Sequence, residues 1–317
     1  MLNFRRSSKY FCRCLNKMSS ITISDVIDSG NITVVDIATG DVKLKIKDEP
    51  YTVGEMKQHK MWFNFKASGV KNQQTTFSIV NAGECSFPVA WKDYNVCTSY
   101  DRKEWFRTPT TYDEAKGHLV WSTKPVADQI YFAYFAPFSW ERHCDLVAQC
   151  VAASTKNPFV PIEVKSVGKT LDGRDMDLIV IGDTSVEGHL KIWANARQHP
   201  GESQAEFWME GYINRLLDDS DSTTRALMKK CVFYIVPNMN PDGSIRGHLR
   251  TNACEFAGRV RFAVVLLIHF IIFFFAIIGG ANLNREWCDT KNSKSPAAVD
   301  GVYQAPTLER SPEVFHG

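Results

Sequence analysis

Residues 190–217 read LKIWANARQHPGESQAEFWMEGYINRLL, a strand followed by a polar turn and then by a helix. The apolar segments DMDLIVIG at 175–182 and CVFYIVPNMN at 231–240 flank this unit, so strands alternate with helices along this part of the chain. Such alternation predicts an α/β domain built on a mixed or parallel sheet. Ligands bind outside the C-terminal ends of the strands in such sheets, so we expect the chemistry directly after WANARQ and after FYIVP.

The chain before residue 136 has a different pattern. Short alternating or β-branched and aromatic segments are separated by Gly, Asp, Asn and Lys clusters, which is typical of an all-β sandwich. The segment at 136–155 has a helical period and is expected to link the two parts. We therefore expect an antiparallel β-sandwich domain at 18–137 and an incomplete α/β domain at 138–317. The expected sandwich strands are NITVVDIA, HKMWFNFKASGV, TTFSIVNAG, GHLVWST and QIYFAYFA.

The composition is that of a soluble globular protein, with 317 residues of which 44% are hydrophobic and 23% charged. A formal net charge of +2 is too small to indicate a nucleic-acid partner, and no run of Lys and Arg interleaves with aromatic residues. Nine cysteines without the spacing of a disulfide framework favour a reducing compartment. We therefore expect a cytoplasmic protein.

Residues 1–17 contain basic but no acidic side chains, a balance found in mitochondrial presequences. Met18 begins MSSITISDVIDSG, a natural start for a domain. The first seventeen residues are therefore either an extension ahead of the true start or a weak targeting segment, and the second alternative would place the protein in mitochondria.

His199 and Glu202 lie in HPGES, between the strand and the helix of the opening stretch. Three residues apart at a turn, an imidazole nitrogen and a carboxylate can face one point, as a tetrahedral zinc site with an open position for water requires. The same spacing also fits a simpler interpretation, in which Glu202 stabilises the helix N-terminus and His199 is an ordinary turn residue. Spacing alone leaves both interpretations open.

The surrounding motifs favour the zinc site. HPGES after one strand, PNMNPDG after the next, then GHLRTN and NLNREW occur in this order. Together they resemble the zinc carboxypeptidases of the carboxypeptidase A type, in particular the cytosolic carboxypeptidase branch. The preceding sandwich, with NAGECSFPVAW, SYDRKEWFR and YFAYFAPFSWERH, resembles the same branch. The resemblance covers residues 18–315.

The resemblance implies roles for five residues. His199 and Glu202 match the first two zinc ligands. Arg250 matches the arginine that stabilises the developing oxyanion. Asn284 and Arg285 match the pair that holds the C-terminal carboxylate of the substrate. The implied activity is the zinc-dependent hydrolysis of C-terminal residues, glutamate among them, from peptides or proteins. Without the other motifs, either arginine would be read as a solvated surface charge.

Two elements of the family pattern have no match. The third zinc ligand, a histidine followed by Gly-Asp-Glu, and the general-base glutamate are both expected beyond LERSPEVF, where the chain stops at Gly317. His316 and Gly317 imitate the ligand dipeptide, but no strand precedes them and no acidic pair follows. A zinc ion with two protein ligands is weakly held, and a water without its base reacts slowly. We therefore expect an inactive chain as written. The alternative is a non-catalytic binding module or a membrane-associated pseudoenzyme.

The apolar run at 262–278 is slightly shorter than the ~20 residues of a membrane-spanning helix. A single crossing would put Arg250 and Arg285 on opposite sides of a ~30 Å hydrocarbon layer, although the expected site needs both. Removing 255–279 joins the flanks as LRTNACGANLNREW, which resembles the uninterrupted family motif. A pyrimidine-rich intron end would encode such a Phe, Ile and Leu string, so we interpret 255–279 as a retained insertion. Membrane contact is expected only if this run is expressed.

Sequencing the spliced transcript across codons 250–317 tests this interpretation. We expect mature message to lack codons 255–279, because the motifs on either side belong together. Uniform retention of these codons would contradict the insertion.

Overall fold

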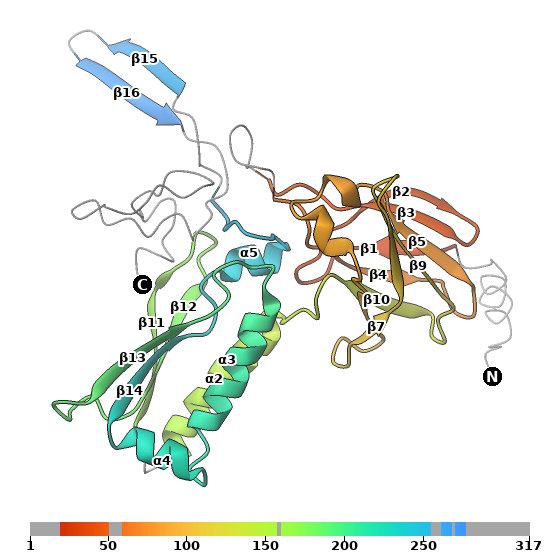
Figure 1. The fold of residues 1–317 in the computed structure, drawn as a ribbon. Coiled ribbons are helices and arrows are strands. Elements are labelled where there is room, and N and C mark those ends of the chain that lie inside the picture. The colour runs from red at the N-terminus through yellow and green to blue at the C-terminus, as the bar shows by residue number, and fades with distance from the viewer. Residues whose placement is uncertain (1–19, 51–58, 157–159, 255–260, 268–269, 277–317) are drawn as a thin grey trace, which may run out of the picture.

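The computed structural model describes residues 20–50, 59–156, 160–254, 261–267 and 270–276. Two bodies of secondary structure follow each other along the chain, a β-rich N-terminal part and a mixed part that begins with a long helix (Figure 1). This order agrees with the two-part architecture that the sequence predicted.

The N-terminal part consists of two five-stranded sheets, ordered β1-β4-β10-β6-β7 and β2-β3-β5-β9-β8. The described neighbours pair antiparallel except β3 and β5, which run parallel. The predicted sandwich is confirmed, with one parallel pair that its strand pattern did not indicate. Its elements are β1 (Thr22–Ser24), β2 (Thr33–Ala38), β3 (Asp41–Lys45), β4 (Asn64–Ser68), β5 (Thr75–Ile79), two 3-10 helices (Ala82–Glu84 and Pro88–Trp91), β6 (Val96–Ser99), β7 (Phe106–Thr108), β8 (Thr110–Asp113), β9 (His118–Thr123) and β10 (Gln129–Ala133).

Aromatic side chains fill the space between the two sheets. Phe77 and Trp121 are cross-strand partners whose rings stack with centroids 5.6 Å apart. Phe65 and Phe132 form the matching pair in the other sheet, 5.4 Å apart. Phe77 also contacts Phe132 across the sandwich at 4.8 Å. These four side chains are buried, because alternate residues of a strand point to the same face.

The second part is a four-stranded mixed sheet in the order β11-β12-β14-β13, with the long helices α2 and α3 on one face (Figure 1). Strands β13 and β14 are parallel, and the other neighbouring pairs are antiparallel. The predicted mixed-sheet α/β domain is thereby confirmed. Its elements are α2 (Trp140–Lys156), β11 (Ile162–Lys169), β12 (Asp175–Ile181), β13 (Leu190–Asn195), α3 (Ser203–Leu216), α4 (Ser222–Met228), β14 (Cys231–Val236) and α5 (Pro241–Arg246).

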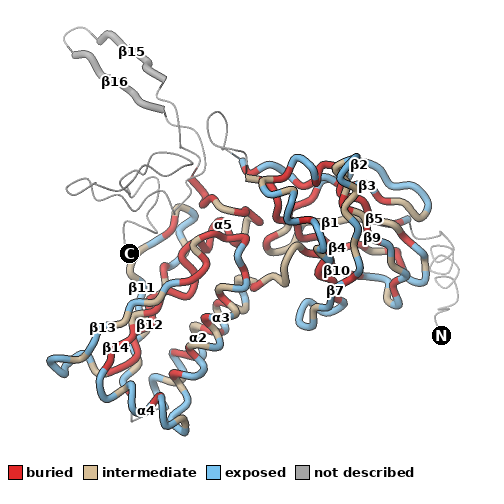
Figure 2. Tube along the Cα trace, in the orientation of Figure 1, coloured by how far each residue is buried: buried red, intermediate tan, exposed pale blue. Residues whose placement is uncertain are grey.

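Burial follows the contact between helices and sheet (Figure 2). Ile179 of β12 and Ile235 of β14 share one apolar cluster with Met209 and Ile213 of α3, and all four are fully buried. The helical spacing of Met209 and Ile213 puts both on the face that meets the sheet. This packing fixes the start of α3, and with it the turn that precedes the helix.

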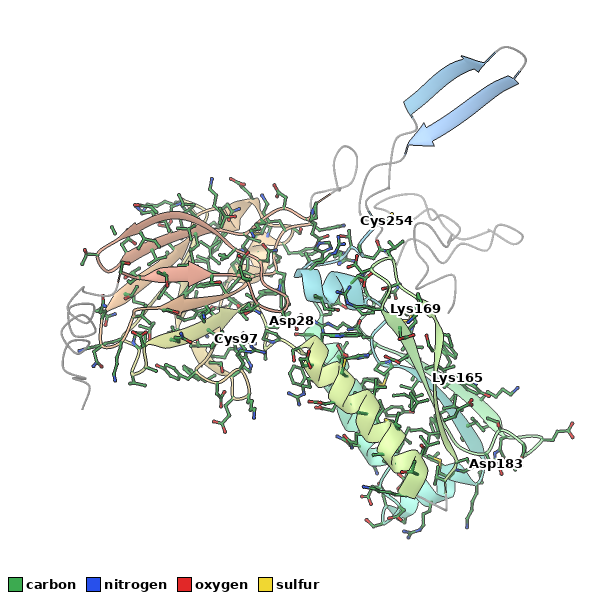
Figure 3. The ribbon with its side chains drawn as sticks, turned by 180° about the vertical axis from the view of Figure 1, so that it is seen from behind. Asp28, Cys97, Lys165, Lys169, Asp183 and Cys254 are labelled. Carbon is green, nitrogen blue, oxygen red and sulfur yellow. The ribbon has the colours of Figure 1, made fainter. Side chains whose placement is uncertain are left out.

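The two parts meet along the loop that follows β1. The carboxylate of Asp28, labelled at the junction in Figure 3, accepts a hydrogen bond from the N–H of Trp140 at the start of α2, 2.9 Å away. The N–H of Ser29 donates to the carbonyl of Ile245 at 2.9 Å. Gly247, the C-cap of α5, has φ +72°, and a Cβ there would lie 2.6 Å from the Ser29 carbonyl oxygen. The N-terminal part therefore holds the end of α5 by backbone contacts that only glycine allows.

The apolar run forms a two-stranded antiparallel ladder, β15 (Arg261–Leu267) with β16 (Phe270–Ala276). In the described part of the chain these strands pair only with each other and stand apart from both larger bodies (Figure 1). No helix among the residues that the structure describes is long and apolar enough to cross a membrane. The retained-insertion interpretation of 255–279 stays a prediction, and residues 255–260, 268–269 and 277–279 of this segment lie outside the described ones.

A pair of glycine substitutions tests the contact at α5. Gly247→Ala should lower the free energy of unfolding by about 1–2 kcal/mol for the left-handed backbone and by a further 1–3 kcal/mol, roughly, for the clash with Ser29. Gly173→Ala is the matched control, because Gly173 has φ +81° but no atom within 4 Å of the place that a Cβ would take. Urea unfolding of both variants gives the difference. Equal losses would mean that the contact with Ser29 carries no energy.

Candidate functional site

The turn that the sequence singled out lies where β13 gives way to α3. Glu202 occupies the N-cap position of α3, yet its side chain makes no capping hydrogen bond. Its Oε1 instead lies 3.1 Å from Nδ1 of His199, which is 9% exposed. Glu202 thus pairs with His199 and makes no capping hydrogen bond, while its place at the N-cap also suits a charge interaction with the helix N-terminus.

The spacing of these two atoms fits a shared metal ion. Two ligands about 2 Å from a tetrahedral zinc lie about 3.3 Å from each other, close to the 3.1 Å between His199 Nδ1 and Glu202 Oε1. The hydrogen bond with His199 holds the pKa of Glu202 below its usual range against partial burial, and the charge of Arg250 acts in the same direction. Glu202 is thus ionised, as a metal ligand must be.

Arg250 lies on the segment that follows α5 and packs against this turn. The N–H of Gly201 donates to the carbonyl of Leu249 at 3.0 Å. A Cβ at Gly201 would lie 2.9 Å from Leu249 Cδ1 and 3.0 Å from its carbonyl oxygen, so the close approach requires glycine. The structure therefore brings three predicted site residues together, namely His199, Glu202 and Arg250.

The other half of the predicted site lies outside the described residues. Asn284 and Arg285 belong to it. His316, which only imitates the third ligand, also lies outside the described residues. Among the residues that the structure describes, no three His, Cys, Asp or Glu side chains gather as a metal site. Within the described part, the candidate ligands are therefore His199 and Glu202.

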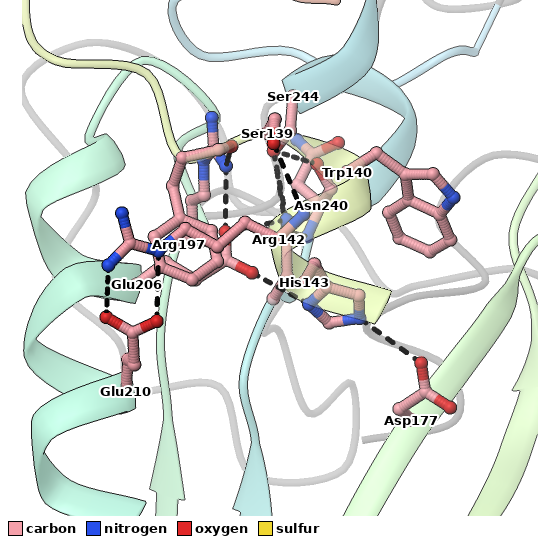
Figure 4. Close-up of polar contacts among 12 residues, drawn as sticks. Ser139, Trp140, Arg142, His143, Asp177, Arg197, Glu206, Glu210, Asn240 and Ser244 are labelled. Atoms are coloured by element: carbon pink, nitrogen blue, oxygen red, sulfur yellow. Dashed lines mark hydrogen bonds and ion pairs between the residues drawn. The ribbon is translucent and has the colours of Figure 1, made fainter. Parts of the chain in front are cut away.

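A buried arginine supports the turn from behind. Arg197 has φ +51°, a left-handed backbone that is uncommon outside glycine, and it is 2% exposed. Its Nε donates to the carbonyl of Pro200 at 3.0 Å, inside the HPGE turn. Its Nη1 donates to the carbonyl of Phe138 at 2.6 Å and to Glu206 Oε2 at 2.7 Å (Figure 4). One guanidinium therefore ties the turn to α3 and to the segment between the two parts.

The carboxylate of Glu206 is shared with a buried histidine. His143 of α2 lies between Glu206 Oε1, 2.7 Å from its Nδ1, and Asp177 Oδ2, 3.2 Å from its Nε2 (Figure 4). Burial would lower the pKa of His143, but its hydrogen bonds to Asp177 and Glu206 outweigh burial and raise the pKa to about 9. The imidazole is therefore charged at neutral pH, and two cations balance two carboxylates in the interior.

The second polar segment, PNMNPDG, builds the helix that leads to Arg250. Asn240 caps α5 by accepting a hydrogen bond from the N–H of Gly243. Asp242 is fully buried and accepts hydrogen bonds from Thr170 Oγ1 at 2.8 Å, from the N–H of Asp172 at 2.9 Å and from Arg174 Nη1 at 2.7 Å. These contacts anchor α5 to the loop between β11 and β12.

Sequence reasoning identified the turn but missed its supports. Arg197 and Glu206 were not singled out, because a buried pair inside a strand end and a helix leaves no spacing signal. His143 carried a usable signal, since it precedes Leu146 and Cys150 by three and seven positions and shares their buried face.

Two family models match the chain. A cytosolic carboxypeptidase N-terminal domain matches residues 23–135, and a zinc carboxypeptidase model matches residues 149–316. An uncharacterized protein of Zymomonas mobilis is 40% identical over 282 residues, or 89% of this chain. The crystal structure of a metallo-carboxypeptidase from Burkholderia cenocepacia matches 94% of this chain with a TM-score of 0.74 at 34% identity. A metallo-carboxypeptidase from Pseudomonas aeruginosa, in complex with (2-guanidinoethylmercapto)succinic acid, matches 93% with a TM-score of 0.70 at 34% identity.

The matched proteins are longer than this chain. The chain spans 63% of the Zymomonas protein, 65% of the Burkholderia chain and 64% of the Pseudomonas chain. The similarity therefore covers about two thirds of each relative.

The buried ion cluster of His143, Glu206 and Asp177 makes the free energy of unfolding depend on pH. Because the pKa of His143 is raised in the folded protein to about 9 from 6.5, its contribution is fully present below pH 6.5 and is lost as the pH rises through about 9. The loss should be at most about 3 kcal/mol. His143→Ala should lower stability at neutral pH by about 3–5 kcal/mol, because it leaves Glu206 and Asp177 short of a partner.

Urea unfolding from pH 6 to pH 9.5 measures both effects. The difference between the wild type and His143→Ala should shrink toward the alkaline end. His118→Ala, in strand β9 of the sandwich, is the control. A pH-independent difference would refute a charged His143.

Proposed function

This chain belongs to the zinc carboxypeptidase family, and from that premise we propose that it serves the zinc-dependent hydrolysis of C-terminal residues from peptides or proteins. The observation that carries the proposal is the 3.1 Å pairing of His199 Nδ1 with Glu202 Oε1 at the end of β13. Arg250 stands beside this pair, and strand ends of mixed sheets are where such sites form.

The proposed roles of the site residues follow from the charge and the position of each side chain. His199 and Glu202 would hold zinc, which when bound polarises the scissile carbonyl and makes a bound water acidic. Arg250 offers a guanidinium to the negative charge that develops on the carbonyl oxygen. Arg197 keeps the turn in place through the Pro200 carbonyl, so the two ligands need little reorganisation.

For the substrate we propose a free C-terminal carboxylate held by Asn284 and Arg285. A planar guanidinium suits bidentate binding of a carboxylate. The Pseudomonas relative is in complex with a succinic acid derivative, a molecule that also carries carboxylates. Acidic C-termini, with glutamate as the released residue, are the proposed class. The match of the N-terminal part to the cytosolic branch supports a cytoplasmic location.

The proposed zinc site has two protein ligands among the residues that the structure describes, where no three His, Cys, Asp or Glu side chains gather as a metal site. A zinc ion with only two protein ligands is weakly held. The competing function is a binding module that retains the fold and the peptide site without turnover.

Zinc content and turnover test the proposal together. His199→Ala and Glu202→Ala should each lower zinc affinity by more than about tenfold, since even outer-shell changes cost 10–100-fold. Metal analysis after dialysis measures the affinity, and release of the last residue from peptides ending in glutamate or alanine measures turnover.

His118→Ala serves as the matched control, because this histidine lies in strand β9 of the sandwich. Zinc content that is the same in His199→Ala and in this control would refute the site. Zinc binding without release from any peptide would favour the binding module.

A further inference from the structure

One carboxylate of the N-terminal part contacts the second part, which is called the catalytic part from here on because it carries the proposed site. Glu49 follows β3, is 4% exposed, and lies against the segment that carries Arg250. One of its oxygens, Oε1, accepts hydrogen bonds from the N–H of Leu249 and, at 2.9 Å, from the N–H of Arg250. The other, Oε2, accepts from the hydroxyl of Thr251 at 2.7 Å. The side chain therefore binds three consecutive residues that lie about two hundred positions further along the chain.

The same segment is joined to the zinc turn on its other side. The carbonyl of Leu249 accepts the N–H of Gly201 at 3.0 Å, within HPGE. The peptide group between Leu249 and Arg250 therefore has a partner on each side. Its N–H donates to Glu49, and its carbonyl accepts the N–H of Gly201 in the HPGE turn. Hydrogen bonds run without interruption from the N-terminal part, through Leu249, to the residue that precedes Glu202.

Within the catalytic part, a hydrogen bond between His248 and Thr251 closes the turn at 248–251. It does not use the N–H groups of Leu249 and Arg250, which donate to Glu49. Nδ1 of His248 donates to the carbonyl of Thr251 at 3.1 Å. Burial lowers the pKa of His248 to about 4, so the ring is neutral and its Nδ1 can carry this proton. The N–H groups of Leu249 and Arg250 face the other way, toward the N-terminal part, and buried backbone donors need a partner.

We propose that Glu49 is a positioning residue for Arg250, by which the N-terminal part completes the active site without touching the substrate. The inference rests on the proposed role of Arg250. A guanidinium stabilises a developing oxyanion only where its position is fixed in advance. Glu49 binds the N–H of Arg250 on one side of its Cα and the hydroxyl of Thr251 on the other, so the Arg250 side chain starts from a defined place.

This role differs from that of an ordinary contact between domains. A contact that only adds stability would lower the unfolding midpoint and leave turnover per folded molecule unchanged. A positioning contact acts on the reaction itself, so its loss should appear in kcat rather than in KM. The conservative change Glu49→Gln keeps an acceptor oxygen for both N–H groups and should therefore preserve the position.

The test compares Glu49→Ala and Glu49→Gln with the wild type in the full zinc-loaded chain. Glu104→Ala is the matched control, because Glu104 is an exposed glutamate of the same sandwich. The first measurement is amide hydrogen exchange at Leu249 and Arg250, and the second is kcat and KM for release of a C-terminal glutamate from a short peptide.

Glu49→Ala should speed exchange at both amides by at least tenfold, roughly, as a buried hydrogen bond is lost. It should lower kcat on the order of a hundredfold, the size expected for misplaced catalytic groups, with KM nearly unchanged. Glu49→Gln should recover most of both.

Unchanged exchange at the two amides in Glu49→Ala would overturn the positioning role, and so would wild-type kcat in that variant. Absence of turnover in the wild type would instead favour the binding module over the proposed hydrolysis. In that case the exchange data alone decide whether Glu49 holds the segment.

Discussion

The Arg197–Glu206 ion pair is the interaction on which the geometry of the site depends. Arg197 stands at the end of β13 in a left-handed backbone conformation, which is costly unless the surroundings impose it. Its guanidinium spans a carboxylate of α3, the carbonyl of Pro200 and the carbonyl of Phe138. The chain can therefore pass from β13 into α3 over residues 196–202 and still bring His199 and Glu202 together.

Burying these charges is expensive, and the network is arranged to limit the cost. Arg197 and a protonated His143 face Glu206 and Asp177, so the cluster is close to neutral. Asn238 adds a further donor to Glu206 at 3.1 Å. Well-packed apolar residues could give similar stability, but they could not hold a carbonyl of the turn in place. The polar cluster is best explained by the orientation that it imposes on the HPGE turn.

Periodic patterns in the sequence predicted the strands and helices. Contacts between residues far apart in the sequence leave no such pattern, so they could not be predicted. Alternation predicted the sandwich strands that carry Phe77 and Trp121, and strand–helix order placed His199 and Glu202 at a strand end. Glu49 lies in the charged cluster KIKDEP, which reads as solvated surface. Its partners are some two hundred residues away, and no local pattern records a pairing of that kind.

Three sets of contacts support the site, and the N-terminal part contributes to more than one of them. The HPGE turn with His199 and Glu202 depends on β13 and on the hydrogen bonds of Arg197. The segment of Arg250 depends on α5, whose C-cap Gly247 fits beneath the loop at Ser29. Glu49 then holds the same segment directly. Two of the three supports thus involve the sandwich, so the second part folded alone would keep the pairing of His199 with Glu202 but lose the groups that hold the segment of Arg250.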